Sequence, residues 1–262
     1  MKTEILNQLE TAWAARTCLC FDTLDSSNEY GKELAKQQPV HGTLIVTDTQ
    51  TAGKGRRGRI WQSPKRSSIY MSLCLEPKFR AERAAGLTLV MALAVAEGVR
   101  QITGCEPKIK WPNDIVLNGK KICGILTEMI LKEEGYAVVI GVGINVNTDS
   151  FPEEIKNTAT SLKLETGMEI SRKLLIAAVM NAFEQFYEQY EKTSDLTLLK
   201  KQYESLLANK DREVRVLDPQ NPYMGIAKGI TSTGNLVVIC EDGTEKEVSS
   251  GEVSVRGLYG YT

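Results

Sequence analysis

A glycine-rich basic loop constrains this chain more than any other stretch. Residues 51–61 read Thr-Ala-Gly-Lys-Gly-Arg-Arg-Gly-Arg-Ile-Trp, so three glycines alternate with the cations Lys54, Arg56, Arg57 and Arg59. Glycine has no Cβ, so the backbone can turn tightly and approach a ligand closely. Lys and Arg side chains, with backbone N–H groups, bind phosphate or carboxylate oxygens. The loop therefore predicts an anion site, carried as an excursion from a sheet edge.

Commoner phosphate motifs fit this loop poorly. Residues 53–58 match the dinucleotide fingerprint as a string, but that motif needs a helix to begin at the loop, and residues 59–61 have an extended pattern. A Walker loop needs Gly-Lys-Ser/Thr, which neither 53–55 nor 119–121 supplies. Two alternatives stay open: a solvated basic turn, and a single-stranded nucleic-acid loop that stacks bases on nearby aromatic side chains.

Overall charge argues against a dedicated nucleic-acid-binding protein. Among 262 residues, 32 Lys and Arg balance 33 Asp and Glu, and the sequence pI is about 6.1. A nucleic-acid-binding domain is expected to be basic. Since the cations gather locally, a small anion is the better partner, and the length allows one large domain plus a small one.

Histidine and cysteine usage indicates a cytoplasmic protein without a metal site of its own. His41 is the single histidine, and the six cysteines include no CxxC pair. Scattered thiols suit a reducing compartment. The first ten residues carry charges and no signal-peptide core, and no run approaches the ~18 apolar residues of a membrane span.

The region before and just after the loop reads as strands with a few helices. Residues 25–28, Asp-Ser-Ser-Asn, form an N-cap cluster with Glu29 in the first helical turn; they either cap a helix or point into a pocket. Apolar spacing predicts helices at 1–16, from this cluster to before Pro39, and at 87–99, with strands at 19–24, 42–50 and 69–75.

A β-hairpin is predicted around Asn118-Gly119. Apolar segments at 115–117 and 121–128 flank this dipeptide, which is the strongest short hairpin signal. The hairpin would place Asp114 and Lys121 together. A further strand at 136–140 leads into the glycine-containing run 141–147, where close approach of a ligand to the backbone is expected. Another strand is expected at 108–111, before Pro112.

Helices are expected at 171–190 and 196–207. After them the sequence pattern changes from helical to strand-like. Five short strands separated by turns follow, at 214–217, 225–230, 235–240, 245–248 and 252–256, and predict a small β-barrel. The expected fold class is α+β: a mixed β-sheet with flanking helices over 1–210, and a small C-terminal barrel over 211–262.

Taken together, these residues resemble the biotin protein ligases. The resemblance lies in blocks at 25–28, 50–61, 110–114, 119–126 and 141–145, which occur in the family's order, and it extends weakly through 151–162 to 251–256. It implies a class II synthetase-like catalytic domain and an SH3-like C-terminal domain. It also implies that biotin and MgATP form biotinyl-5′-AMP, from which biotin passes to a lysine of a biotin carboxyl carrier protein.

The resemblance also implies roles for individual residues. The biotin contacts would be Ser26, Ser27, Asn28, Gln50, Gly53, Gly55, Arg56, Trp61, Lys121, Gly124 and Gly141. The ATP contacts would be Lys54, Arg56, Arg57, Arg59, Trp61, Asn113, Lys121, Asn145 and Arg256. The catalytic group would be Lys121, Arg56, Asp114 and Lys54. Magnesium would arrive with ATP and not on protein side chains.

A purely structural role stays open for two of these residues. Asp114, the expected base for the carrier lysine, could simply cap the turn after Pro112, and Lys121 could be a solvated hairpin residue. Lys54 stands where many family members have arginine, so a bidentate grip is lost while the charge is kept. That substitution puts tight retention of the adenylate in doubt.

Ligases that double as repressors carry a helix-turn-helix domain ahead of the first block, and sixteen residues cannot hold one. We therefore expect no DNA binding, no membrane association, and a monomer or a weak homodimer. A lipoate–protein ligase is the rival enzyme, but its family pattern lacks the basic loop. A non-catalytic nucleic-acid-binding protein is the other rival. Biotin-dependent ATP–pyrophosphate exchange separates it from a ligase.

Overall fold

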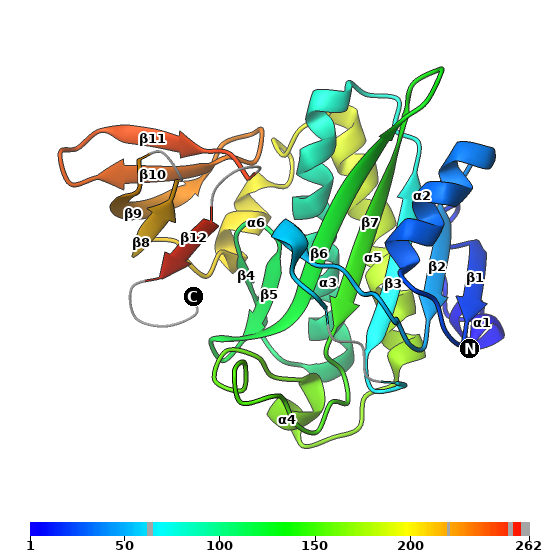
Figure 1. The fold of residues 1–262 in the computed structure, drawn as a ribbon. Coiled ribbons are helices and arrows are strands. Elements are labelled where there is room, and N and C mark those ends of the chain that lie inside the picture. The colour runs from blue at the N-terminus through cyan, green and yellow to red at the C-terminus, as the bar shows by residue number, and fades with distance from the viewer. Residues whose placement is uncertain (62–64, 219–220, 251–253, 258–262) are drawn as a thin grey trace.

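A seven-stranded mixed sheet forms the body of the protein (Figure 1). This computed structural model describes residues 1–61, 65–218, 221–250 and, by backbone alone, 254–257. The strand order is β1-β2-β3-β7-β6-β5-β4, with β1 and β2 parallel and every other pair antiparallel. The strands are β1 (Thr17–Phe21), β2 (Thr43–Thr47), β3 (Ile69–Leu75), β4 (Lys108–Lys110), β5 (Asp114–Leu117), β6 (Lys120–Leu131) and β7 (Tyr136–Ile144).

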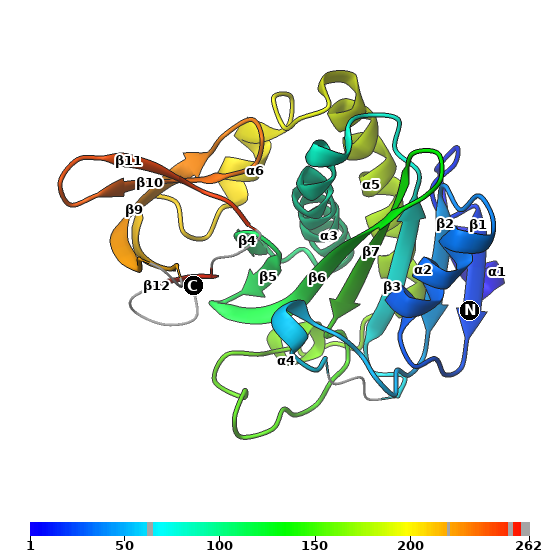
Figure 2. The same cartoon turned by 45° about the horizontal axis from the view of Figure 1, so that its top comes forward.

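The two faces of this sheet are covered differently (Figure 2). Helices α3 (Leu87–Thr103) and α5 (Arg172–Thr193) pack together against one face and form the main hydrophobic core with it. On the opposite face, α2 (Ser27–Gln37) covers a smaller cluster that includes Ile45 and Val139. The asymmetry leaves the part of that face over β6 and β7 available to the basic loop.

Helix α3 is nearly all apolar because both its sides are buried. With the preceding 3-10 helix η2 (Ala81–Gly86) it forms the one described segment, Ala81–Thr103, long and apolar enough to span a membrane by length and composition. The most apolar part of that segment is 67% buried within the protein. A core helix between a sheet and α5 has that composition for packing reasons alone.

A second, five-stranded antiparallel sheet follows, in the order β11-β10-β9-β8-β12. Its strands are β8 (Arg212–Leu217), β9 (Tyr223–Ile230), β10 (Leu236–Cys240), β11 (Glu245–Val248) and β12 (Ser254–Gly257), and α6 (Lys200–Leu206) leads into it. The indole N–H of Trp111, from the first sheet, donates to the carbonyl of Gly234 in the second at 2.9 Å. The α+β prediction, with a small β-domain at the C-terminal end, is confirmed.

Two local predictions need correction, and one short helix had no counterpart among the predictions. The expected helix over 1–16 is only α1 (Lys2–Leu6); the irregular chain after it is held by the buried Glu184 carboxylate, which accepts the backbone N–H groups of residues 12–14. The expected helix at 196–207 shortens to α6. The short helix α4 (Leu162–Thr166), capped by the hydroxyl of Ser161, was not foreseen.

Candidate active site

A polar cavity opens on the α2 face, over the middle of the sheet. Its floor comes from β3, β6 and β7, one wall from the N-terminus of α2, and its cover from the basic loop. The lining residues are Ser26, Ser27, Asn28, Gln50, Lys54, Gly55, Arg56, Trp61, Tyr70, Met71, Asn113, Lys121, Gly124, Ile125, Leu126, Gly141, Val142 and Gly143. Twelve of these were predicted site residues, and they come from five separate stretches of sequence.

One end of the cavity is a neutral hydrogen-bond network. Gln50 Oε1 accepts from the backbone N–H of Ser27 at 2.8 Å and from its hydroxyl at 3.1 Å. Ser72 Oγ lies 2.7 Å from the Ser27 hydroxyl and 2.6 Å from Asn28 Oδ1. Ser26 meanwhile caps α2 by accepting the Glu29 N–H. Both interpretations of the cap cluster therefore hold, since one serine caps and its neighbours line the cavity.

Three glycines in the floor let side chains lie directly on the backbone. A Cβ on Gly141 would stand 2.2 Å from Asn28 Oδ1, and one on Gly143 would stand 2.5 Å from the Trp61 ring. A Cβ on Gly124 would meet the same ring at 2.9 Å. Sequence reasoning named Gly124 and Gly141 as site residues and missed Gly143.

The basic loop is a small hairpin of its own. Gly53 O accepts from Trp61 N at 2.9 Å, Lys54 bridges Ile60, and Gly55 N donates to Arg59 O at 2.7 Å. A single 3-10 turn, Arg56–Gly58, closes it. The expected extended return of the chain is confirmed, and no α-helix begins here as a dinucleotide fingerprint would require.

Arg56 points inward and links the loop to both domains. Its guanidinium donates to Asn113 Oδ1 at 2.9 Å and to the carbonyl of Ser250. Burial lowers the pKa of Arg56 from its ordinary value, because the charged form loses hydration. Asn113 is itself anchored, since its side-chain amide donates to Ile125 O at 2.9 Å. These contacts hold a cation over the cavity.

Lys121 and Asp114 form an ion pair within the predicted hairpin. Lys121 Nζ lies 2.5 Å from Asp114 Oδ1 and 5.3 Å from the centre of a Trp61 ring. The backbone of Lys121 pairs with the segment at 158–160, whose Thr158 carbonyl accepts its N–H at 2.8 Å. Asp114 does not line the cavity, but through this ion pair it stands directly behind the lysine that does.

Some predicted site residues lie away from the cavity lining. Arg57 and Arg59 are exposed, and Gly53 is buried in the base of the loop. Asn145 is buried and donates to the Thr160 carbonyl. Arg256 lies on β12 with its side chain outside the described residues, as does the segment 251–253.

Sequence reasoning also missed the apolar side of the cavity. Tyr70, Met71, Ile125, Leu126 and Val142 line it, all from strands whose alternating faces could be read only once the register was known. Among the described residues, no group of three or more His, Cys, Asp or Glu side chains is placed to hold a metal ion.

Comparison with known proteins agrees with this arrangement. The family model "Biotin/lipoate A/B protein ligase family" matches residues 20–145, and "Biotin protein ligase C terminal domain" matches residues 211–256. The chain is 38% identical to a bifunctional ligase/repressor BirA of Bacillus spizizenii, over 95% of this chain and 77% of the relative. It is 31% identical to a biotin–[acetyl-CoA-carboxylase] ligase of Mycobacterium tuberculosis, over 82% and 79%.

Comparison with solved structures shows the same similarity at the level of the whole fold. The biotin protein ligase of Aquifex aeolicus, in complex with biotin and ATP, superposes with a TM-score of 0.82 at 33% identity, covering 92% of this chain and 99% of that one. The similarity thus extends over both sheets and over the segments that line the cavity. The chain belongs to the biotin protein ligase family.

Proposed function

We propose that this chain activates biotin with ATP to form biotinyl-5′-AMP and then transfers biotin to a lysine of a biotin carboxyl carrier protein. One observation carries the proposal: three cations, Lys54 and Arg56 from the basic loop and Lys121 from strand β6, line a single cavity whose other end is neutral and polar. The relatives named as biotin ligases support it, as does the Aquifex relative that binds biotin and ATP.

In this scheme the neutral end receives the ring system of biotin. The Ser27 hydroxyl, Gln50 and Asn28 offer both donors and acceptors, which a ureido group requires. The apolar side chains of Met71 and Val142 would contact the rest of the ligand. The carboxylate of biotin would then extend toward the basic loop.

The first chemical step brings two anions together. An oxygen of the biotin carboxylate attacks the α-phosphorus of ATP, the new O–P bond forms, and the bond to the departing pyrophosphate breaks. Lys54, Arg56 and Lys121 would offset the repulsion and the charge that develops in the transition state. Removing one such donor from a preorganised site typically costs about 10²–10³ in rate.

Magnesium fits this site as a companion of ATP. The described lining contains cations, amides and hydroxyls but no Asp or Glu, so it suits phosphate oxygens better than a bare cation. The ion would remain on the phosphates, where it would supply additional neutralisation of their charge.

The second step consumes the adenylate. The carrier lysine, once deprotonated, attacks the acyl carbon of biotin, the amide bond forms, and AMP leaves with the bonding electrons of the acyl–oxygen bond. Asp114 would accept the proton from the incoming ammonium group, and Lys121 at 2.5 Å would orient that carboxylate.

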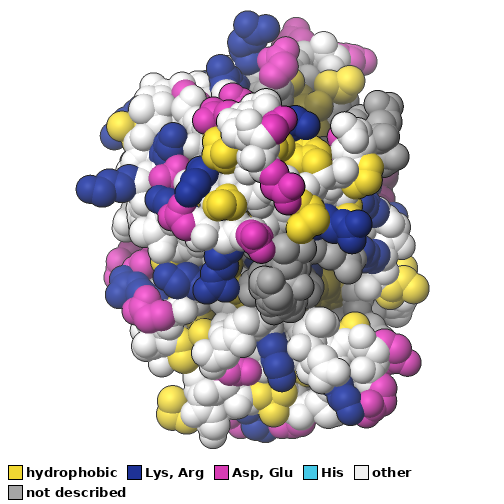
Figure 3. All heavy atoms as spheres, turned by 90° about the vertical axis from the view of Figure 1, so that its left-hand side faces the viewer, with side chains coloured by type: hydrophobic (Ala, Val, Ile, Leu, Met, Phe, Trp, Pro, Cys, Tyr) yellow, Lys and Arg dark blue, Asp and Glu magenta, His cyan; other side chains and the backbone are white. Residues whose placement is uncertain are grey.

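The charge distribution visible in Figure 3 supports small molecules and a protein partner rather than DNA. On the face shown in Figure 3, Lys and Arg side chains are interspersed with Asp and Glu and do not form a one-sign field. All six cysteines are free thiols, which fits a cytoplasmic enzyme. Strand β1 lies at an end of the sheet order and would supply the edge for a weak homodimer.

Biotin-dependent ATP–pyrophosphate exchange tests the proposal. The wild-type protein should exchange label, and Lys121→Ala should lower the exchange rate by about 10²–10³. Lys36→Ala is the matched control, because Lys36 pairs with Glu33 on the exposed side of α2 and should leave the rate unchanged. A wild-type protein without exchange, or a Lys121→Ala variant at the wild-type rate, would contradict the proposal.

A further inference from the structure

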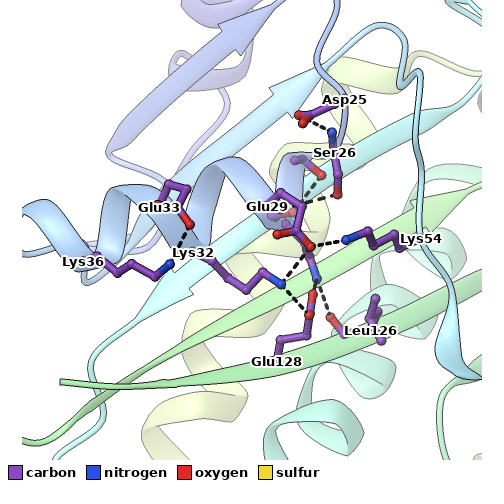
Figure 4. Close-up of polar contacts among 12 residues, drawn as sticks. Asp25, Ser26, Glu29, Lys32, Glu33, Lys36, Lys54, Leu126 and Glu128 are labelled. Atoms are coloured by element: carbon purple, nitrogen blue, oxygen red, sulfur yellow. Dashed lines mark hydrogen bonds and ion pairs between the residues drawn. The ribbon is translucent and has the colours of Figure 1, made fainter. Parts of the chain in front are cut away.

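The loop cation Lys54 is already engaged by a carboxylate of the protein. Its Nζ lies 2.6 Å from Glu29 Oε1, which projects from the first turn of α2 toward the loop (Figure 4). The same oxygen contacts Lys32 Nζ at 2.8 Å. These two lysines lower the pKa of Glu29, with the hydrogen bond from Lys32 contributing most.

The ion pair continues into the floor of the cavity. Lys32 also contacts Glu128 Oε1 at 2.8 Å, and Glu128 Oε2 accepts from the side-chain amide of Asn28 at 2.8 Å. Two cations and two carboxylates therefore alternate from the loop to Asn28, with no net charge. Figure 4 shows this chain of contacts running from Lys54 to Glu128.

This arrangement makes Lys54 easy to release. If Lys54 leaves, Glu29 keeps Lys32 as its partner, so no unpaired carboxylate results. The Lys54 side chain is 52% exposed, so it needs little repacking to turn toward the cavity that it already lines. An exposed ion pair of this kind is weak enough for a ligand anion to compete with it.

We propose that the Glu29 carboxylate competes with the ligand anion for Lys54. In the absence of an anion it ties the basic loop to α2 across the mouth of the cavity. When a carboxylate or phosphate oxygen arrives, Lys54 transfers to it and Glu29 stays with Lys32. This inference rests on the proposed function, in which the ligands are biotin and ATP.

The carboxylate of Glu29 then lowers the affinity of the site for an anionic ligand. A ligand anion bound to Lys54 must either displace Glu29 or lie beside its negative charge, and both reduce binding. Removing that charge while keeping the side-chain shape should therefore strengthen binding. Removing the charge would instead weaken ligand binding if Glu29 acted mainly by holding the loop in its binding conformation.

The variant Glu29→Gln distinguishes tighter ligand binding, which the competitor role predicts, from weaker ligand binding. Calorimetric affinities for biotin and for MgATP, measured separately at low salt, should show one of the two ligands binding about two- to five-fold more tightly, the range expected from an exposed ion pair. The KM of that ligand in pyrophosphate exchange should fall by the same factor while kcat changes less than about twofold. High salt should abolish the difference, because exposed charges are screened.

Two further variants make the result specific. Glu33→Gln removes a carboxylate one turn along the same helix, where it pairs with Lys36 on the solvent side, and should leave both affinities unchanged. In a Lys54→Met background, Glu29→Gln should no longer tighten binding. If the wild type exchanges pyrophosphate but Glu29→Gln binds both ligands equally or more weakly, the competitor role is wrong while the proposed function stands. A wild type that exchanges nothing would instead remove the proposed function itself.

Discussion

Gly141→Ala offers a sharp test of how the cavity floor is built. The added Cβ would stand 2.2 Å from Asn28 Oδ1, more than an ångström inside the 3.4 Å of ordinary contact. Asn28 cannot easily yield, because it is 4% exposed and fully engaged. Its amide donates to Leu126 O and Glu128 Oε2, while Ser72 Oγ lies 2.6 Å from its carbonyl oxygen.

The cost follows from these contacts. Forcing an extra methyl group into a packed site costs about 1–3 kcal/mol. Turning Asn28 away would leave buried partners unsatisfied, at about 1–3 kcal/mol more. We therefore expect Gly141→Ala to lower the free energy of unfolding by about 2–6 kcal/mol. At about 2–4 °C per kcal/mol for a chain of this size, Tm should fall by at least about 4 °C.

Thermal and denaturant unfolding of Gly55→Ala, of Asn28→Ala and of the Asn28→Ala/Gly141→Ala double variant tests this steric account. Gly55→Ala is the control, because its Cβ would meet Arg59 O at an ordinary 3.4 Å and its φ of −115° suits any residue; it should change stability by less than about 0.5 kcal/mol. Asn28→Ala should make room for the methyl group, so the double variant should be at least about 1 kcal/mol more stable than additivity predicts. Additive effects, or an unchanged Tm in Gly141→Ala, would refute the steric account.

Two predictions concern titratable groups. Burial lowers the pKa of His41 below its ordinary 6.5, and its Nδ1 accepts the Glu76 N–H at 3.1 Å, so the unfolded chain takes up a proton more readily. Stability should therefore fall as the pH drops from about 6.5 through the lowered folded pKa, and Tm should fall less over that range in His41→Gln. The hydrogen bond from Cys18 lowers the pKa of Cys20 to about 7, so peptide mapping after iodoacetamide treatment should show Cys20 alkylated first, with a rate midpoint near pH 7 that rises in Cys18→Ala. Earlier alkylation of Cys105 would contradict this.

The hairpin that carries Asp114 and Lys121 was predictable because its determinants are local. Asn118 and Gly119 adopt φ values of 49° and 77°, the left-handed pair that a tight hairpin turn needs. With the turn placed, the antiparallel pairing of β5 and β6 brings Asp114 next to the Lys121 region. Similarly, strand β3 was predicted with its observed bounds, since a run of mostly apolar residues can be recognised from the sequence alone.

Features that depend on distant partners were not predictable. Ser72 sits in the apolar run of β3 and gives no sign of its contact with Asn28, 44 residues earlier. The irregular segment after α1 depends on Glu184, more than 170 residues away, whose carboxylate replaces the hydrogen bonds that a longer helix would have made. The Glu29–Lys54 pair likewise links two stretches whose proximity only the fold creates.

The glycines of the floor leave space that side chains of the protein occupy in this structure. Glycine at a strand end predicts close approach to the backbone, and here the space over Gly141 holds Asn28, while that over Gly124 and Gly143 holds Trp61. These two occupants differ in how they are held. Asn28 is held by hydrogen bonds to Leu126 and Glu128 of the sheet, whereas Trp61 is held by the backbone hydrogen bond of the loop hairpin to Gly53 O. The glycines therefore seat two different occupants: a polar side chain fixed by the sheet over Gly141, and an aromatic ring supplied by the basic loop over Gly124 and Gly143.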